Sequence, residues 1–317
     1  MDTLFFIFRQ MMFFSIPLLI VALGGMFSER SGVVNIALEG IMTMGAFTSI
    51  LCINLLQDRM SGQPLLILAI FIAAITGMLF SFFHAYASIH MKADQTISAT
   101  ALNMFAPAFA IFAARQIQNI QQINFNNTFR INEVPILGKI PILGDMLFKR
   151  AYITTYLGFI ILIVSVIVLY KTRFGLRLRA CGEHPHAAES VGISVIKIRY
   201  TGVLISGALG GIGGLVFVIP NSTNFNATVA GYGFLALAVL IFGQWKPIRI
   251  LFAALFFGLM KTIASSYSGI PMLAGLGISS YVYKMIPYIA TLVVLAFTSK
   301  KSQAPRAAGI PYDKGQR

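Results

Sequence analysis

Apolar stretches of about 20 residues recur along this chain and are separated by short polar or charged segments. An α-helix rises about 1.5 Å per residue, so a stretch of this length crosses the roughly 30 Å hydrocarbon core of a bilayer. About a quarter of the residues in soluble domains are charged, whereas this chain is 57% hydrophobic and only 11% charged. We therefore predict an all-α fold, a polytopic membrane helical bundle that forms a single transmembrane domain over residues 1–317.

Nine candidate membrane segments can be marked, and eight or ten are also compatible with the pattern. The seventh segment is short for a full crossing, and polar groups in the second and fourth favour broken or re-entrant helices. The first segment has no small-residue cleavage site after it, so we expect it to be retained. The nine segments lie near residues 11–27, 33–56, 64–89, 95–114, 152–170, 200–219, 231–243, 250–266 and 281–298.

The positions of the basic residues predict the orientation. Thirteen of the 24 Lys and Arg residues lie in segments 171–199, 244–249 and 300–317, whereas segments 220–230 and 267–280 have none. Basic residues are enriched in cytoplasmic loops, so the first three segments, and with them the C-terminus, are predicted to be cytoplasmic. The net charge of +14 is explained in the same way and does not indicate nucleic-acid binding. The side on which the N-terminus lies stays open.

The longest stretch without a membrane segment, residues 115–151, is rich in Asn and Gln and then in Gly and Pro. We predict an extracytoplasmic loop that forms a short outward-facing hairpin or helix pair. It is interpreted either as a solvated connector or as a rim that meets an extracytoplasmic partner. The tail at 299–317 is assigned to the cytoplasm.

Polar side chains inside two predicted spans indicate a candidate substrate path. Asn35 and Glu39 are four residues apart and share one helix face. Gln95, Thr96 and Asn103 repeat this pattern in a second span. A carboxylate at membrane depth is costly unless it faces protein or a watery cavity. Two such segments are typical of transporter sites built from paired discontinuous helices, but an interhelical contact is an equally open role for Glu39.

The glycine-rich run at 206–214 fits no phosphate-binding loop. The spacing of Gly207 with Gly211, and of Gly210 with Gly214, instead predicts small surfaces for close helix packing.

A short helix is predicted within the basic loop, over residues 182–193. Pro185 is suited to open a helix and Gly192 to close it. We expect its small apolar face, with Ala187 and Ala188, to dock on a partner, although an ordinary amphipathic connector is the alternative. No ATP-binding motif or metal-ligand spacing is present, so no cofactor and no metal are expected to bind the chain directly.

The order of several motifs resembles that of the membrane permease of bacterial ABC importers, in the branch for simple sugars and nucleosides. His184 and His186 replace the more usual Asn and Lys of that family. The resemblance covers nearly the whole chain. It rests on residues 29–47, 94–103, 172–193, 231–247, 286–297 and 304–317.

The resemblance implies that the short helix couples the permease to a cytoplasmic ATPase, which binds ATP. It also implies a second permease subunit, identical or paralogous, and an extracytoplasmic substrate-binding protein or lipoprotein. Phe234 is added to the substrate path, because a flat ring suits stacking on a base. The coupling residues implied are Gly182, Glu183, His184, Pro185, Ala187, Ala188 and Gly192.

We therefore expect a multi-pass permease subunit of the bacterial cytoplasmic membrane that imports nucleosides and is not itself an enzyme. Import of a simple sugar such as a pentose is the alternative within the class. A secondary, ion-coupled transporter is the alternative from another class, but the poor supply of acidic residues inside the spans argues against it.

Overall fold

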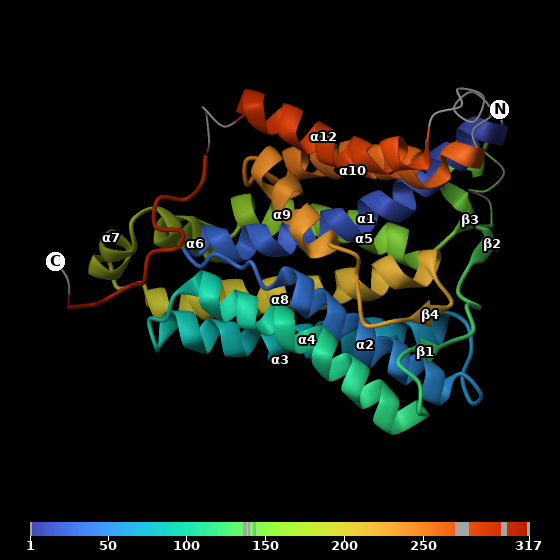
Figure 1. The fold of residues 1–317 in the computed structure, drawn as a ribbon. Coiled ribbons are helices and arrows are strands. Elements are labelled where there is room, and N and C mark those ends of the chain that lie inside the picture. The colour runs from blue at the N-terminus through green and yellow to red at the C-terminus, as the bar shows by residue number, and fades with distance from the viewer. Residues whose placement is uncertain are drawn as a thin grey trace.

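The computed structural model describes residues 2–135, 138, 140–141, 144–269, 279–298 and 303–315, and these form an elongated helical bundle (Figure 1). Seven of the described helices are long and apolar enough to cross a membrane. These are α1 (Asp2–Arg30), α2 (Leu38–Leu56), α3 (Gln63–Ile89), α4 (Gln95–Gln118), α5 (Ile153–Lys171), α8 (Val195–Asn221) and α10 (Pro247–Ser266). The seventh and ninth predicted segments correspond to the short α9 (Tyr232–Phe242) and to α12 (Ser280–Thr298).

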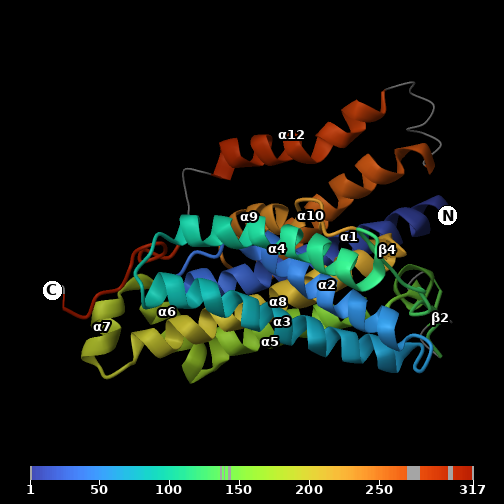
Figure 2. The same cartoon turned by 60° about the horizontal axis from the view of Figure 1, so that its bottom comes forward.

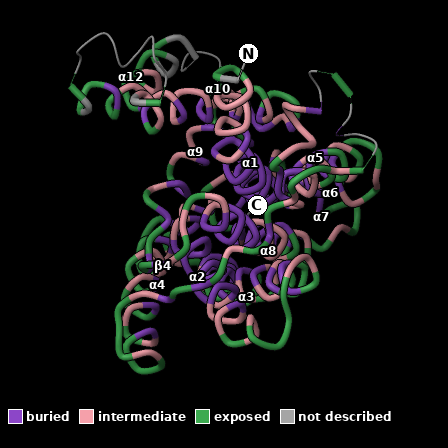
Figure 3. Tube along the Cα trace, turned by 90° about the vertical axis from the view of Figure 1, so that its right-hand side faces the viewer, coloured by how far each residue is buried: buried purple, intermediate pink, exposed green. Residues whose placement is uncertain are grey.

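The first predicted segment is the central helix of the bundle. Side chains around the whole circumference of α1 are buried between Ile16 and Phe27, as expected for a helix without a polar face. It packs against α5, α8, α9 and α10. Figure 3 shows the buried residues gathered around α1, α2 and α8, with α4 and α12 at the more exposed periphery. Figure 2 shows α10 and α12 on the opposite side of the bundle from α3 and α5.

The glycines of α8 form two packing surfaces, as predicted. An added Cβ at Gly207 or Gly211 would overlap α3, where it would meet Ser81 or the backbone oxygen of Ala73. On the neighbouring face of α8, Gly210 and Gly214 face α2. Small residues let helix backbones approach closely where no hydrophobic effect drives association. The spacing of four residues therefore gives α8 two different partner helices.

Two helices begin inside the bundle instead of at its end. The second predicted span is broken, because residues 31–37 are not helical and α2 begins only at Leu38. The predicted break in the fourth span is wrong, since α4 runs as one helix over all of that span. The other helix that begins inside the bundle is α9. Its 11 residues rise about 16 Å, which is about half the thickness of the hydrocarbon core of a bilayer.

Short strands and a one-turn helix close one end of the bundle, which we call the strand end. Strand β1 (Ile123–Asn124) pairs with β4 (Asn224–Phe225). Strand β2 (Ile131–Glu133) pairs antiparallel with β3 (Lys149–Ala151), across the π-helix η2 (Gly144–Phe148). Among its described residues, loop 115–151 thus contains one antiparallel strand pair, β2 with β3, whereas β1 pairs with β4 outside the loop.

The opposite end carries α6 (Arg173–Glu183), α7 (Pro185–Ser190) and the C-terminal segment at 303–315, and we call it the α7 end. The N-terminus lies at the strand end and the C-terminus at the α7 end (Figure 1). The 3-10 turn η3 (Tyr267–Gly269) follows α10, and most of predicted segment 267–280 lies outside the described residues.

Candidate functional site

The starts of α2 and α9 meet inside the bundle at Glu39. The Glu39 carboxylate accepts hydrogen bonds from the backbone N–H groups of Gly231, at 2.8 Å, and Gly233, at 2.6 Å. A Cβ at position 233 would overlap the backbone of Glu39, so the close approach requires a glycine there. Unpaired N–H groups and the helix dipole make a helix N-terminus attractive to a carboxylate. The half-buried Glu39 carboxylate on the first turn of α2 therefore ties this helix to the start of α9.

The non-helical segment before α2 is held by side chains of α3 and α4. The Gln95 Oε1 atom accepts a hydrogen bond of 2.7 Å from the backbone N–H of Val34. The Val34 carbonyl accepts a hydrogen bond of 2.9 Å from His84 Nε2. Both side chains thus satisfy backbone groups that the break in the helix leaves without partners.

Asn35 and Asn103 also form hydrogen bonds that stabilise the non-helical segment before α2. The Asn103 side chain accepts a hydrogen bond from Gly40 N at 2.8 Å and donates one to the Ile36 carbonyl at 3.0 Å. Asn35 is fully buried and donates to Ser206 Oγ of α8 at 2.9 Å. Ser206 is about 16 Å along α8 from its first residue, so the junction lies deep in the bundle.

These contacts change the interpretation of the predicted substrate path. The structure brings Asn35, Glu39, Gln95 and Asn103 together, but they make contacts within the chain. Asn35, Asn103 and the Oε1 atom of Gln95 stabilise the break, and Glu39 binds the start of α9, whereas the Nε2 atom of Gln95 has no partner among the described residues. Thr96, on the first turn of α4, is exposed and belongs to no part of this junction. The structural role that the sequence left open for Glu39 is therefore supported by the geometry, and extends to its neighbours.

Removal of the Glu39 carboxylate is expected to lower the melting temperature in detergent. Hydrogen bonds to a charged group contribute about 1.5–3 kcal/mol each, and Glu39→Ala removes two of them from a half-buried site. Asp94 provides a matched control, because its exposed carboxylate caps α4 through the N–H groups of Thr96 and Ile97. Asp94→Ala should lower the melting temperature less than Glu39→Ala, because the Asp94 carboxylate is exposed to solvent. An unchanged melting temperature for Glu39→Ala, with lost uptake, would instead support a role in the substrate path.

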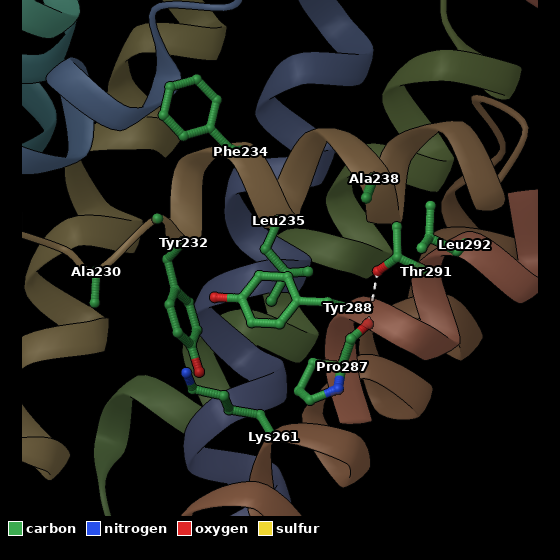
Figure 4. Close-up of a pocket in the computed structure, with 11 residues that line it drawn as sticks. Ala230, Tyr232, Phe234, Leu235, Ala238, Lys261, Pro287, Tyr288, Thr291 and Leu292 are labelled. Atoms are coloured by element: carbon green, nitrogen blue, oxygen red, sulfur yellow. Dashed lines mark hydrogen bonds between the residues drawn. The ribbon is translucent and has the colours of Figure 1, made fainter. Parts of the chain in front are cut away.

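A cavity of about 480 Å³ lies between α9, α10 and α12, next to the Glu39 junction. Phe234, the aromatic residue predicted for the substrate path, lines it and is half exposed. Figure 4 shows Tyr232, Lys261 and Tyr288 in the same cavity. None of these three residues was predicted from the sequence to lie in the substrate path, although a lysine inside an apolar span was a visible signal. Gly231 belongs to both the junction and the cavity wall, so the two features are continuous.

The short helix predicted over 182–193 is present at the α7 end. Pro185 is the first residue of α7, and Gly192 follows its end with a φ of +82°, a conformation that favours glycine. His184 and Ala187 are exposed. The local prediction for this helix is confirmed.

Two of the predicted coupling residues are buried within the chain instead of facing outward. Ala188 is 4% exposed and packs with Cys181, Val195 and Tyr312. Gly182 accepts a backbone hydrogen bond from Ala307 at 2.8 Å. The expectation that Ala188 presents an apolar surface to a partner is therefore wrong, because the C-terminal segment already covers it.

The C-terminal segment ties α7 to the rest of the α7 end. Arg199 of α8 donates to the Ile310 carbonyl at 3.0 Å and lies over the Tyr312 ring. Gly309 donates to the Gly32 carbonyl at 3.3 Å, in the turn that leads to the break before α2. A continuous set of contacts thus connects α7 with the junction at Glu39.

Two ion pairs, at Asp313 and Lys314, attach the end of the C-terminal segment to the rest of the α7 end. Lys92 contacts the Asp313 carboxylate at 2.6 Å, and its hydrogen bond holds the pKa of Asp313 below its usual range. Lys314 contacts Glu189 of α7 at 3.3 Å. Exposed ion pairs contribute little individually, so the buried contacts carry most of the attachment.

A second cluster at the α7 end joins three of the sequence motifs. Buried Glu29 accepts a hydrogen bond of 2.6 Å from Trp245 Nε1. Arg30 donates to the Trp245 carbonyl at 3.2 Å and lies 3.8 Å from the Glu183 carboxylate. The end of α1, the end of α6 and the turn before α10 are therefore fastened to one another, and Glu183 serves this contact.

Comparison with known proteins shows that the chain is similar to permease components of transport systems. Residues 7–295 match the family described as branched-chain amino acid transport system / permease component. The chain is 42% identical over 316 residues to the nucleoside ABC transporter permease protein NupC of Lactococcus lactis subsp. cremoris, covering 99% of both chains. It is 44% identical over 306 residues to the guanosine ABC transporter permease protein NupQ of Bacillus subtilis, covering 96% of this chain and 95% of the relative.

A more distant relative is the putative glucose ABC transporter permease protein TsgC13 of Haloferax volcanii, 28% identical over 315 residues, which are 92% of this chain and 91% of the relative. No solved structure gives a significant match.

Proposed function

The chain belongs to the branched-chain amino acid transport system / permease component family, and on this premise we propose that it is the membrane-spanning subunit of an ATP-driven nucleoside importer. The observation that carries the proposal is the 42% and 44% identity, over nearly the whole chain, to permeases named for nucleosides and for guanosine. Import of a simple sugar is the second candidate, since the glucose permease relative is also similar over most of its length. Ion-coupled transport has no support among these relatives.

The proposal assigns energy conversion to a separate cytoplasmic ATPase that docks on α7. Exposed His184 and Ala187 at the tip of the α7 end support this assignment. Contacts through the C-terminal segment would pass a displacement of α7 to the turn at Gly32 and so to the start of α2. A second permease subunit and an extracytoplasmic substrate-binding protein or lipoprotein complete the assembly.

We place the α7 end in the cytoplasm and count nine membrane segments, with α9 as a half-crossing. The strand end, including the N-terminus, is then extracytoplasmic. This orientation puts the basic segments 171–199 and 244–249 on the cytoplasmic side, in agreement with the rule for basic loops.

Cysteine labelling tests the orientation. In a chain without Cys52 and Cys181, a single cysteine at exposed Thr223 of the strand end should react with a membrane-impermeant thiol reagent in intact cells. One at exposed Arg306 should react only after the cells are permeabilised, which also serves as its control. Labelling at 306 in intact cells would reverse the assignment.

Transport by right-side-out vesicles tests the function itself. Vesicles that contain the permease, its ATPase and its binding protein should accumulate labelled nucleoside only when ATP is loaded inside. Vesicles without the ATPase are the control. Uptake driven by an ion gradient without ATP would indicate a secondary transporter, and uptake of a pentose but not of a nucleoside would favour the sugar alternative.

A further inference from the structure

The cavity between α9, α10 and α12 combines aromatic, cationic and apolar groups. Its volume of about 480 Å³ is within the range of about 300–1,000 Å³ for sites of small molecules. Tyr232, Phe234 and Tyr288 contribute aromatic rings, whereas Leu235 and Leu292 contribute aliphatic surface (Figure 4). Such a lining, mostly apolar with few polar groups, is typical of a ligand site.

Lys261 is the charged group in this wall. It is the fifteenth residue of α10, about 21 Å along the helix from its start, and therefore lies within the membrane-spanning part. Its ammonium group lies 5.8 Å from the centre of the Tyr232 ring, and no described carboxylate is within ion-pair distance of it. A lone cation at this depth is costly and marks a functional position. Its three N–H donors are suited to an acceptor group of a ligand.

The hydroxyl group of Tyr232 is the second unused polar group. Tyr232 is 1% exposed, and its oxygen is buried without a hydrogen-bond partner among the described residues. Buried polar atoms nearly always have partners, because an unpaired one is costly. The Tyr232 hydroxyl group, a hydrogen-bond donor, and the cationic Lys261 side chain therefore belong to the same part of the cavity, where α9 begins.

We propose that this cavity binds purine nucleosides that carry an oxygen at C6, such as inosine and guanosine, an inference that rests on the function proposed above. The O6 and N7 atoms of such a purine are adjacent acceptors, and lysine is a common partner for this pair. The rings of Phe234 and Tyr288 offer surfaces on which a base stacks. Adenosine carries an amino group at C6, a donor that cannot pair with an ammonium group.

The test is uptake of labelled inosine and adenosine, measured separately with the assembled transporter in vesicles. The wild type should prefer inosine. Lys261→Met keeps the unbranched shape of the side chain without its charge, and should raise the apparent KM for inosine about tenfold or more. The KM for adenosine should not rise, so the preference is lost. Lys261→Arg keeps the donors and should retain part of the preference.

Two further variants make the test specific. Lys284→Met removes an exposed lysine of α12 that does not line the cavity, and should change neither substrate. Tyr232→Phe removes one oxygen atom and should weaken inosine uptake more than adenosine uptake. Co-purification with the ATPase and the melting temperature report on assembly, and Tyr232→Phe decides the question if Lys261→Met does not assemble.

The outcomes separate this inference from the proposed function. A wild-type transporter that imports neither these purine nucleosides nor a pyrimidine nucleoside such as uridine contradicts the proposed function, whereas import of the pyrimidine nucleoside alone contradicts only the cavity assignment. If the wild type imports nucleosides without preferring inosine, or if Lys261→Met keeps the wild-type preference, the cavity assignment is wrong and the importer function stands. An equal loss for both nucleosides also contradicts it, since it would mean that Lys261 supports the structure or another occupant of the cavity.

Discussion

Replacing Gly211 with valine is expected to prevent accumulation of the folded protein. A Cβ at this position would overlap the backbone oxygen of Ala73 in α3 and would lie close to the backbone of Gly77 in the same helix. Both neighbours are backbone and not flexible side chains, so α3 would have to move away from α8. Overpacking costs about 1–3 kcal/mol or more even where side chains can adjust. The loss is greater here, because close packing is a main source of helix association in membranes.

The yield of monodisperse protein in detergent and its melting temperature measure this effect. Thr201→Val is a suitable control, since Thr201 lies on the exposed face of the same helix. Gly211→Ala should give an intermediate loss, because it adds one methyl group to the same contact. Normal yield and stability of Gly211→Val would show that α8 does not pack on α3 as described.

The second large effect is expected from aspartate at two neighbouring positions of α7. Ala187 is exposed, whereas Ala188 is buried against Cys181, Val195 and Tyr312. Ala187→Asp should leave the melting temperature unchanged but place an unpaired charge in the proposed ATPase contact, where such a charge costs about 3–5 kcal/mol. Co-purification with the ATPase and ATP-driven uptake should then fall at least tenfold.

Ala188→Asp should instead release the C-terminal segment and lower the melting temperature of the permease alone. The two variants are matched in chemistry and lie next to each other, so they distinguish a docking surface from an internal contact. Normal uptake by Ala187→Asp would remove the support for α7 as the coupling element. A normal melting temperature for Ala188→Asp would contradict the burial of Ala188 against Tyr312 of the C-terminal segment.

Features that depend on residues close together in the chain could be predicted before the fold was known. Length and hydropathy predicted the membrane helices, because the thickness of a bilayer sets the length of an apolar segment. The four-residue spacing of Gly207 with Gly211 predicted a packing surface, because residues four apart share a helix face. Pro185 and Gly192 predicted the ends of α7 through their own backbone preferences.

Contacts between segments that are distant in the chain could not be predicted in this way. Asn103 suggested a second broken helix, but it stabilises the break before α2, and the interrupted partner of α2 is α9. The sequence predicted that Ala188 faces a partner protein, whereas in the structure Tyr312 of the C-terminal segment packs against it. A polar or small side chain has the same local pattern whether it faces a cavity, a neighbouring helix or a loop. Its role is set by the groups that the fold brings within hydrogen-bond or van der Waals distance, and no local pattern records them.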